Sequence, residues 1–339
     1  MRSNRTGIRQ AGGGRKALVE TDVSLLSDLE DLVEPASRGE PESPLRWTSK
    51  SGAKLAQALQ TKGHQISPRT VCTLLDDLGY SLQANRKTRE GKEHPDRDEQ
   101  FEHIANTVMD FQKRHQPVIS VDAKKKELVG NYKTQGEEWQ PQNMPVEVNT
   151  HDFMDVQLGK VIPYGVYDIT ENQGWLTVGI DHDTAQFAVA SIRQWGSRMG
   201  QALYPAAKAL MMTADCGGSN SYRTKLWKWQ LQQLANALNL TLHVCHFPPG
   251  TSKWNKIEHR LFSQITENGR GRPLVSREVV VSLIASTKTS TGLSVNAALD
   301  EGSYPTGIQV SKENFDSILI EPDTFHGKWN YQILPMQQS

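Results

Sequence analysis

Cysteine and long apolar runs are both scarce in this sequence, and their scarcity excludes two classes of protein. The 339 residues include only 3 cysteines, far apart in the chain, which argues against a disulfide framework and suits a reducing cytoplasm. No apolar stretch approaches the roughly 20 residues of a membrane-spanning helix, and the polar, arginine-bearing start has no signal-peptide pattern. We therefore expect a cytoplasmic protein that does not associate with membranes.

Net charge is also lacking, because 38 basic residues balance 38 acidic ones. No global field therefore draws the chain to nucleic acid or to a membrane, and any such contact must use local patches. Residues 1–20 are predicted to form one such patch, a flexible basic arm around Gly12–Gly14 that can follow phosphates or enter a minor groove. A tail with incidental charge is the alternative. The basic residues of the arm are Arg2, Arg5, Arg9, Arg15 and Lys16.

Residues 21–90 have the hydrophobic spacing of three helices, the second and third joined by a short turn at Gly63. Ser67 followed by Pro68 is typical of an N-cap and first helical position, so the third helix is expected to begin there. This arrangement predicts a helix-turn-helix DNA-binding domain, with a three-helix bundle that does not bind nucleic acid as the alternative. The expected DNA contacts are Arg69, Thr70 and Thr73 in the third helix and Arg86 and Lys87 after it.

Strands and helices alternate from residue 117 onward. A charged linker helix is expected within residues 91–116, a catalytic domain over residues 117–290 and a C-terminal extension over residues 291–339. The order β, β, β, α, β, α, β, α predicts an α/β sheet covered by helices. The expected strands lie near residues 117–123, 165–169, 175–180, 210–214 and 240–244, and the expected helices near residues 187–198 and 226–238.

The stretch from Val244 to Ile265 contains an unusual carboxylate. It has the pattern of a strand end, a Pro-Pro-Gly turn and a helix with Thr251 or Ser252 as N-cap. Glu258 falls inside the apolar stripe of that helix, where a carboxylate is unfavourable unless it is paired or binds a metal. A structural salt bridge or a misplaced helix boundary is the alternative. The stripe consists of Trp254, Ile257, Leu261, Phe262 and Ile265.

Two further carboxylates give Glu258 candidate partners. Asp122 lies in the expected strand near residues 117–123. Asp215 follows the expected strand near residues 210–214 and precedes Gly217–Gly218. Because strand ends of an α/β sheet meet at one crevice, we expect the three carboxylates to converge there. Such hard oxygen ligands suit two Mg²⁺ or Mn²⁺ ions, which can activate a water or a 3′-hydroxyl toward a phosphodiester. The neighbouring Lys124 and Lys125 are candidate contacts to the DNA backbone.

Three segments make a family resemblance recognisable. Ser120–Lys126, Thr213–Asn220 and His246–Arg260 closely resemble the catalytic blocks of the Rhodopirellula-type DDE transposases of bacterial insertion sequences, a family distantly similar to the Tc/mariner group. The resemblance implies an RNase H-like mixed sheet flanked by helices, joined to the N-terminal helical domain. It also implies a two-metal active site in which Asp122, Asp215 and Glu258 are the catalytic triad.

Together these features predict an insertion-sequence transposase in the bacterial cytoplasm, associated with the nucleoid. It would bind the terminal inverted repeats of its element, cut there and join the 3′-OH ends to target DNA by transesterification, as a homo-oligomer on DNA. One alternative is an RNase H-like nuclease without strand transfer. Another is an inactive DNA-binding relic, because family members usually carry a helical segment before the glycine-rich basic stretch.

Overall fold

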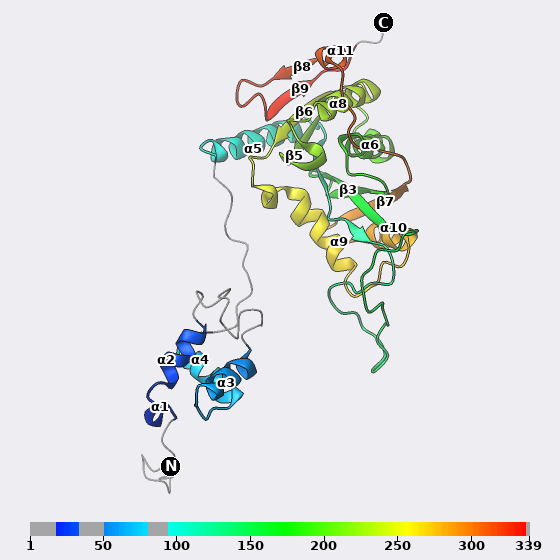
Figure 1. The fold of residues 1–339 in the computed structure, drawn as a ribbon. Coiled ribbons are helices and arrows are strands. Elements are labelled where there is room, and N and C mark those ends of the chain that lie inside the picture. Colours follow the sequence, from blue (N-terminus) through cyan, green and yellow to red (C-terminus); the bar gives the residue numbers. More distant parts are fainter. Residues whose placement is uncertain (1–17, 34–50, 81–93, 337–339) are drawn as a thin grey trace, which may run out of the picture. The chain divides into compact units, whose positions relative to one another are not determined.

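The computed structural model describes residues 18–33, 51–80 and 94–336, which fall into two compact units, Met1–Thr88 and Arg89–Ser339 (Figure 1). Among the described helices, none has the length and apolar character needed to cross a membrane. Of the predicted DNA-binding residues, Arg15, Lys16, Arg86 and Lys87 lie outside the described ranges.

The N-terminal unit is helical, and its caps are the ones its sequence favours. The Ser51 hydroxyl accepts a hydrogen bond from the Lys54 amide at the start of α3, and Ser67 accepts one from the Thr70 amide at the start of α4. Gly63 has a φ of +102° in the turn between these helices, a conformation that glycine adopts without strain. The helices are α1 (Leu18–Thr21), α2 (Leu25–Val33), α3 (Gly52–Thr61) and α4 (Pro68–Asp77).

The larger unit is built on a nine-stranded mixed sheet in the order β7-β4-β3-β1-β5-β6-β9-β8, with β2 paired to β3. β1 runs antiparallel to β3 and parallel to β5, and β5 runs parallel to β6. The strands are β1 (Val118–Ala123), β2 (Glu127–Leu128), β3 (Lys160–Asp168), β4 (Gln173–Gly179), β5 (Ala209–Ala214), β6 (Thr241–His246), β7 (Ser294–Asp300), β8 (Ile320–Pro322) and β9 (Asn330–Ile333).

Helices cover both faces of this sheet (Figure 1). Alternation along β1 sends Ile119 and Val121 to the face covered by α6 and α8, whereas Val118 packs toward α5 on the other face. The helices and short turns are α5 (Arg97–Lys113), α6 (Ala185–Trp195) with a π turn (Gly196–Gly200), α7 (Gln201–Leu203), a 3₁₀ turn (Gly218–Asn220), α8 (Lys225–Leu238), a 3₁₀ turn (Ser252–Trp254), a π turn (Glu258–Phe262), α9 (Ser263–Asn268), α10 (Arg277–Ala285) and α11 (Lys312–Asp316).

The predicted mixed sheet flanked by helices, with a separate N-terminal helical unit, is confirmed. The segment expected as a linker helix forms α5, whose Ile104 and Phe111 pack against the sheet. Residues 291–339, set apart by sequence as an extension, contribute β7, β8 and β9 to the same sheet.

Trp254 does not belong to the predicted apolar stripe. Asn255 has an extended backbone with a ψ of 125°, which separates the 3₁₀ turn from the helix that follows. Trp254 therefore lies before the helix, and 53% of its surface is exposed. The other four members of the stripe, Ile257, Leu261, Phe262 and Ile265, are buried.

Candidate active site

Asp122 and Asp215 leave adjacent strands at the same edge of the sheet. In the parallel pair of β1 and β5, Val121 lies opposite Ala214, and each carboxylate is the next residue along its strand. Glu258 comes from the chain that leaves the neighbouring strand, β6, and it opens the π turn. The fold therefore brings two of the candidate carboxylates side by side, with the third entering from the segment after β6.

The segment that carries Glu258 packs closely on β3 and β4. Ile257, Leu261 and Phe262 join one apolar cluster with residues of these strands, and burial of each side chain contributes about 2 kcal/mol. Gly165 of β3 makes this approach possible, because a Cβ there would lie 2.5 Å from the Phe262 ring and 2.9 Å from Ile257. Glu258 is therefore half-buried at the border of this apolar cluster, whereas its apolar neighbours are buried.

Neighbouring carboxylates raise the pKa of Asp122 and of Asp215. Burial, and then the charge of Asp215, raise the pKa of Asp122 to about 8. Burial also raises the pKa of Asp215 to about 6, with Glu258 adding to the rise and a hydrogen bond from Asn255 opposing it. Burial raises the pKa of Glu258 as well, opposed by His259 and Lys124. Partly buried carboxylates that raise one another's pKa favour a bound cation.

A fourth carboxylate, Asp183, lies near Asp122. It directly precedes Thr184, the N-cap of α6, and its charge raises the pKa of Asp122. The Asp183 Oδ1 atom is buried and has no hydrogen-bond partner among the described residues. A buried carboxylate oxygen without a partner, close to the carboxylate of Asp122, fits a site for Mg²⁺ or Mn²⁺. Asp168 differs: it is the buried last residue of β3 and accepts hydrogen bonds from the Thr170 and Glu171 amides and the Tyr204 hydroxyl.

His246 supports this site without being a candidate zinc ligand. Its ring is fully buried, with Nδ1 3.0 Å from the Asp215 carbonyl oxygen and Nε2 3.1 Å from the Tyr331 hydroxyl. Burial lowers the pKa of His246 to about 4, so the ring is neutral at pH 7 and bridges the end of β5 to β9. Both ring nitrogens of His246 are therefore engaged within the protein.

A different set of side chains within the described residues has spacing suited to a transition metal. Ligand atoms of His94, Asp96 and His326 all lie within 4.8 Å of one another. Already, His326 Nε2 lies 2.8 Å from Asp96 Oδ2, and the His326 ring stacks on Trp329. These contacts give the cluster a structural role, because they connect the start of α5 to the turn before β9.

Comparison with known proteins identifies the family. A family model described as the Rhodopirellula transposase DDE domain matches residues 28–335. The chain belongs to this family. The match begins within α2 and ends after β9, so it includes residues of both units. The resemblance recognised from the catalytic blocks is thereby confirmed, and the chain matches no curated protein.

Solved structures of Mos1 transposase are also similar to this member of the transposase family. A Mos1 paired-end complex with the left transposon end has 12% identity and a TM-score of 0.41, with 81% of this chain and 72% of that chain covered. A Mos1 mariner paired-end complex with Mn has 13% identity and a TM-score of 0.40, with 80% and 72% covered. The family assignment rests on the family model rather than on these distant similarities.

The predicted DNA-binding side chains of the transposase differ in solvent exposure and in their contacts with other side chains. Arg69 and Thr73 are exposed on α4, whereas the Thr70 hydroxyl lies 2.8 Å from that of the capping Ser67. Lys124 forms an ion pair with Glu127 at 2.8 Å, and Lys125 is exposed. Among the predicted contacts that the structure describes, Arg69, Thr73 and Lys125 have exposed side chains.

A hollow of about 620 Å³ lies between α5 and the segment around Glu258. Phe101, Val108 and Met109 line it from α5, and the exposed Trp254 lines it from the opposite side. The basic side chains at its edge are Lys256, His259 and Arg260. This combination of an aromatic ring and basic groups is of the kind that binds nucleic acid.

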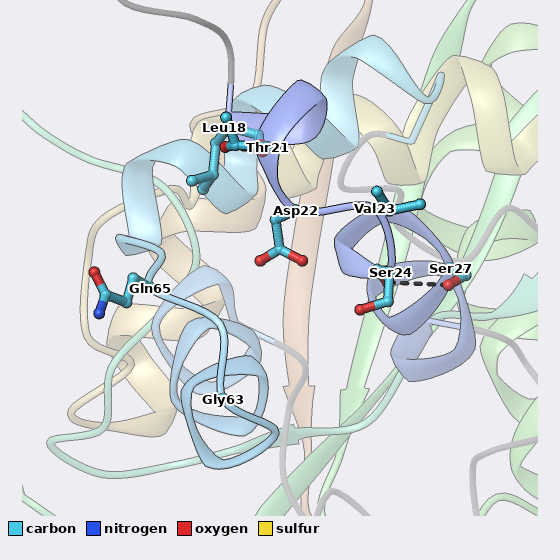
Figure 2. Close-up of a pocket in the computed structure, with 8 residues that line it drawn as sticks. All are labelled: Leu18, Thr21, Asp22, Val23, Ser24, Ser27, Gly63 and Gln65. Atoms are coloured by element: carbon cyan, nitrogen blue, oxygen red, sulfur yellow. Dashed lines mark hydrogen bonds between the residues drawn. The ribbon is translucent and has the colours of Figure 1, made fainter.

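The N-terminal unit has a hollow of its own, of about 720 Å³, beside the turn between α3 and α4 (Figure 2). Asp22, one of its lining residues, carries a carboxylate that lies 2.8 Å from His64 Nδ1, while Asp28 lies 3.0 Å from His64 Nε2. Lys62 pairs with Asp28 at 2.5 Å. His64 is therefore a buried link between the start of α2 and the turn between α3 and α4.

This link predicts a pH-dependent stability of the N-terminal unit. The hydrogen bond to Asp22, together with Asp28, raises the pKa of His64, so the protonated ring stabilises the fold. That contribution is complete below the ordinary histidine pKa of about 6.5 and is lost as pH rises through the raised value. In the parent, the unfolding temperature of this unit should decrease as the pH is raised from 6 to 9. The His64→Gln variant should not show this decrease. His151→Gln, at an exposed histidine of the larger unit, is the control; equal pH dependence in all three proteins would contradict the prediction.

Proposed function

We propose that the protein is a metal-dependent DDE transposase that cuts DNA at the ends of its element and joins the 3′-OH ends to target DNA. The observation that carries the proposal is the placement of Asp122 and Asp215 at adjacent strand ends, with Glu258 on the segment after β6 and its charge raising the pKa of both aspartates. Membership of a DDE transposase family supports the same assignment of the triad.

The residues of the chain have distinct parts in this proposal. Asp122 and Asp215, at adjacent strand ends, would hold divalent cations from the sheet, and Glu258 would do so from the segment after β6. Two Mg²⁺ or Mn²⁺ ions held there would activate the attacking water or 3′-hydroxyl and stabilise the leaving oxygen. Lys124, whose charge acts on Glu258, would moderate the negative charge of the group and help to hold the DNA backbone nearby.

DNA recognition is assigned to the N-terminal unit and to basic groups near the triad. The α4 helix, with Arg69 and Thr73 exposed, would enter the major groove of the terminal inverted repeat. Lys125 and the basic edge of the larger unit's hollow would contact phosphates near the cut. Because both ends of an element must be held together, we propose that the protein acts as a homo-oligomer on DNA.

The test uses labelled element ends, a target plasmid and Mg²⁺. We expect cleaved ends and joined product from the parent protein, and neither from Asp215→Ala, which should still bind the ends. Cleavage without joined product would instead indicate an RNase H-like nuclease. If the parent and Asp215→Ala bind DNA equally and neither cuts, the protein is a DNA-binding relic.

A further inference from the structure

Asn255 contacts the segments of all three candidate catalytic carboxylates. It is fully buried, and its side-chain amide Nδ2 donates a hydrogen bond of 3.2 Å to Asp215 Oδ1. Its main-chain carbonyl accepts a hydrogen bond of 3.2 Å from the Glu258 amide. Its Oδ1 accepts a hydrogen bond from Ser120, two residues before Asp122 on β1. The side chain of Asn255 thus joins β1 to the end of β5, and its main-chain carbonyl joins both to the start of the helix that carries Glu258.

Ser120 determines which way the Asn255 amide points. The Ser120 hydroxyl is fully buried and accepts a hydrogen bond of 3.3 Å from the Ile257 amide, so its own proton is left to donate to Asn255 Oδ1. With its oxygen held by Ser120, the Asn255 amide presents its NH₂ group to the Asp215 carboxylate. The reversed orientation would place two oxygens against each other at Asp215 and lose the Ser120 bond.

These contacts leave Asp215 little freedom. Its carboxylate is held by Asn255, and its main-chain carbonyl is held by the buried His246 ring. Asn255 also ends the 3₁₀ turn, since its amide donates to the Ser252 carbonyl at 2.9 Å, and the chain turns there into the helix of Glu258. The same residue therefore sets where Glu258 starts and where Asp215 points.

We propose that Asn255, oriented by Ser120, is a positioning residue that fixes Asp215 and Glu258 relative to Asp122 for divalent-metal binding. The inference rests on the proposed function only in taking these carboxylates as the metal site. Hydrogen-bonded partners of metal ligands typically account for about 10- to 100-fold in metal affinity. We therefore expect Asn255→Ala to weaken Mn²⁺ binding by at least about 10-fold and to raise, by a similar factor, the Mg²⁺ concentration for half-maximal cleavage.

Mn²⁺ binding is measured on the full-length protein without DNA, by electron paramagnetic resonance, beside thermal unfolding without metal. Gln232→Ala is the matched control, because Gln232 is a fully buried amide whose partners are Asn236, Leu334 and Leu319. It should lower the unfolding midpoint as Asn255→Ala does, yet leave Mn²⁺ affinity within about 2-fold of the parent.

A second pair of variants keeps the test decisive if Asn255→Ala does not fold. Ser120→Ala removes the hydroxyl that orients the amide and should weaken Mn²⁺ binding about 10-fold, whereas Ser120→Thr keeps the hydroxyl and should stay within about 2-fold of the parent. Unchanged Mn²⁺ affinity in both Asn255→Ala and Ser120→Ala would overturn the inference. Failure of the proposed function looks different, since the parent would then bind Mn²⁺ with this dependence on Asn255 and yet yield no joined product.

Discussion

Glu258→Gln is expected to lower Mg²⁺-dependent DNA cleavage by at least about 100-fold while the larger unit remains folded. The substitution removes one of three metal-binding carboxylates, and two-metal stabilisation of a phosphodiester transition state amounts to several kcal/mol, with about 1.4 kcal/mol for each tenfold in rate. Burial already raises the pKa of Glu258, so its charged form is unfavourable in the metal-free fold. At pH 8 without metal, the variant should therefore unfold at or above the temperature of the parent.

Glu267→Gln is the matched control for this prediction. Glu267 lies on the same helical segment, in α9, and its exposed carboxylate pairs with Arg270 at 2.7 Å. Exposed ion pairs contribute about 0–1 kcal/mol, so this variant should cleave like the parent. Cleavage by Glu258→Gln at the parent's rate would show that Glu258 is not part of the active site, despite its position beside Asp122 and Asp215.

Without metal, the larger unit is expected to lose stability as the pH rises from about 5 to 8. The groups facing Asp122 are Asp215, Glu258 and Asp183, all acidic, and the pKa of Asp122 is about 8 in the fold against 3.8 in an unfolded chain. The folded state therefore binds more protons than the unfolded state between these values, and its free energy of unfolding falls with pH. The slope is up to about 1.4 kcal/mol per pH unit for one such group. Asp215, with a pKa of about 6, adds to the fall only below that pH.

Urea unfolding at pH 6 and pH 8 measures this effect, and Asp122→Asn should remove most of the fall between these two pH values. Cation binding requires the ionised carboxylates, so Mg²⁺ should release about one proton per protein at pH 7. Titration calorimetry in two buffers of different ionisation enthalpy counts that proton. Stability that is constant or rises from pH 6 to pH 8, with no proton released on Mg²⁺ binding, would contradict the assigned protonation of Asp122.

Much of the sheet and the convergence of the carboxylates followed from local patterns. The apolar run before Asp215 predicted β5 almost to the residue, and parallel neighbours place Asp122 and Asp215 at one edge because strand ends coincide there. The start of α4 followed from its capping residue Ser67, whose side chain accepts the expected hydrogen bond from the Thr70 amide. These features depend on residues close in sequence.

The features that sequence did not predict depend on contacts between distant residues. β7, with the sequence SVNAALD, pairs with β4 along its length, yet it has too weak an apolar alternation to stand out alone. Asn255 seemed an ordinary helix residue because its partners Ser120 and Asp215 are remote in sequence. Trp254 was placed in a helical stripe because the extended backbone at Asn255 has no local signal.

We propose that Asp122, Asp215 and Glu258 together bind the metal ions required for DNA cleavage. The most direct measurement is anomalous diffraction from crystals of the full-length protein soaked in Mn²⁺ with a DNA end bound. We expect two manganese peaks, roughly 3.5–4 Å apart, among these three carboxylates. Manganese found only at His94, Asp96 and His326, with none at the three carboxylates, would contradict it.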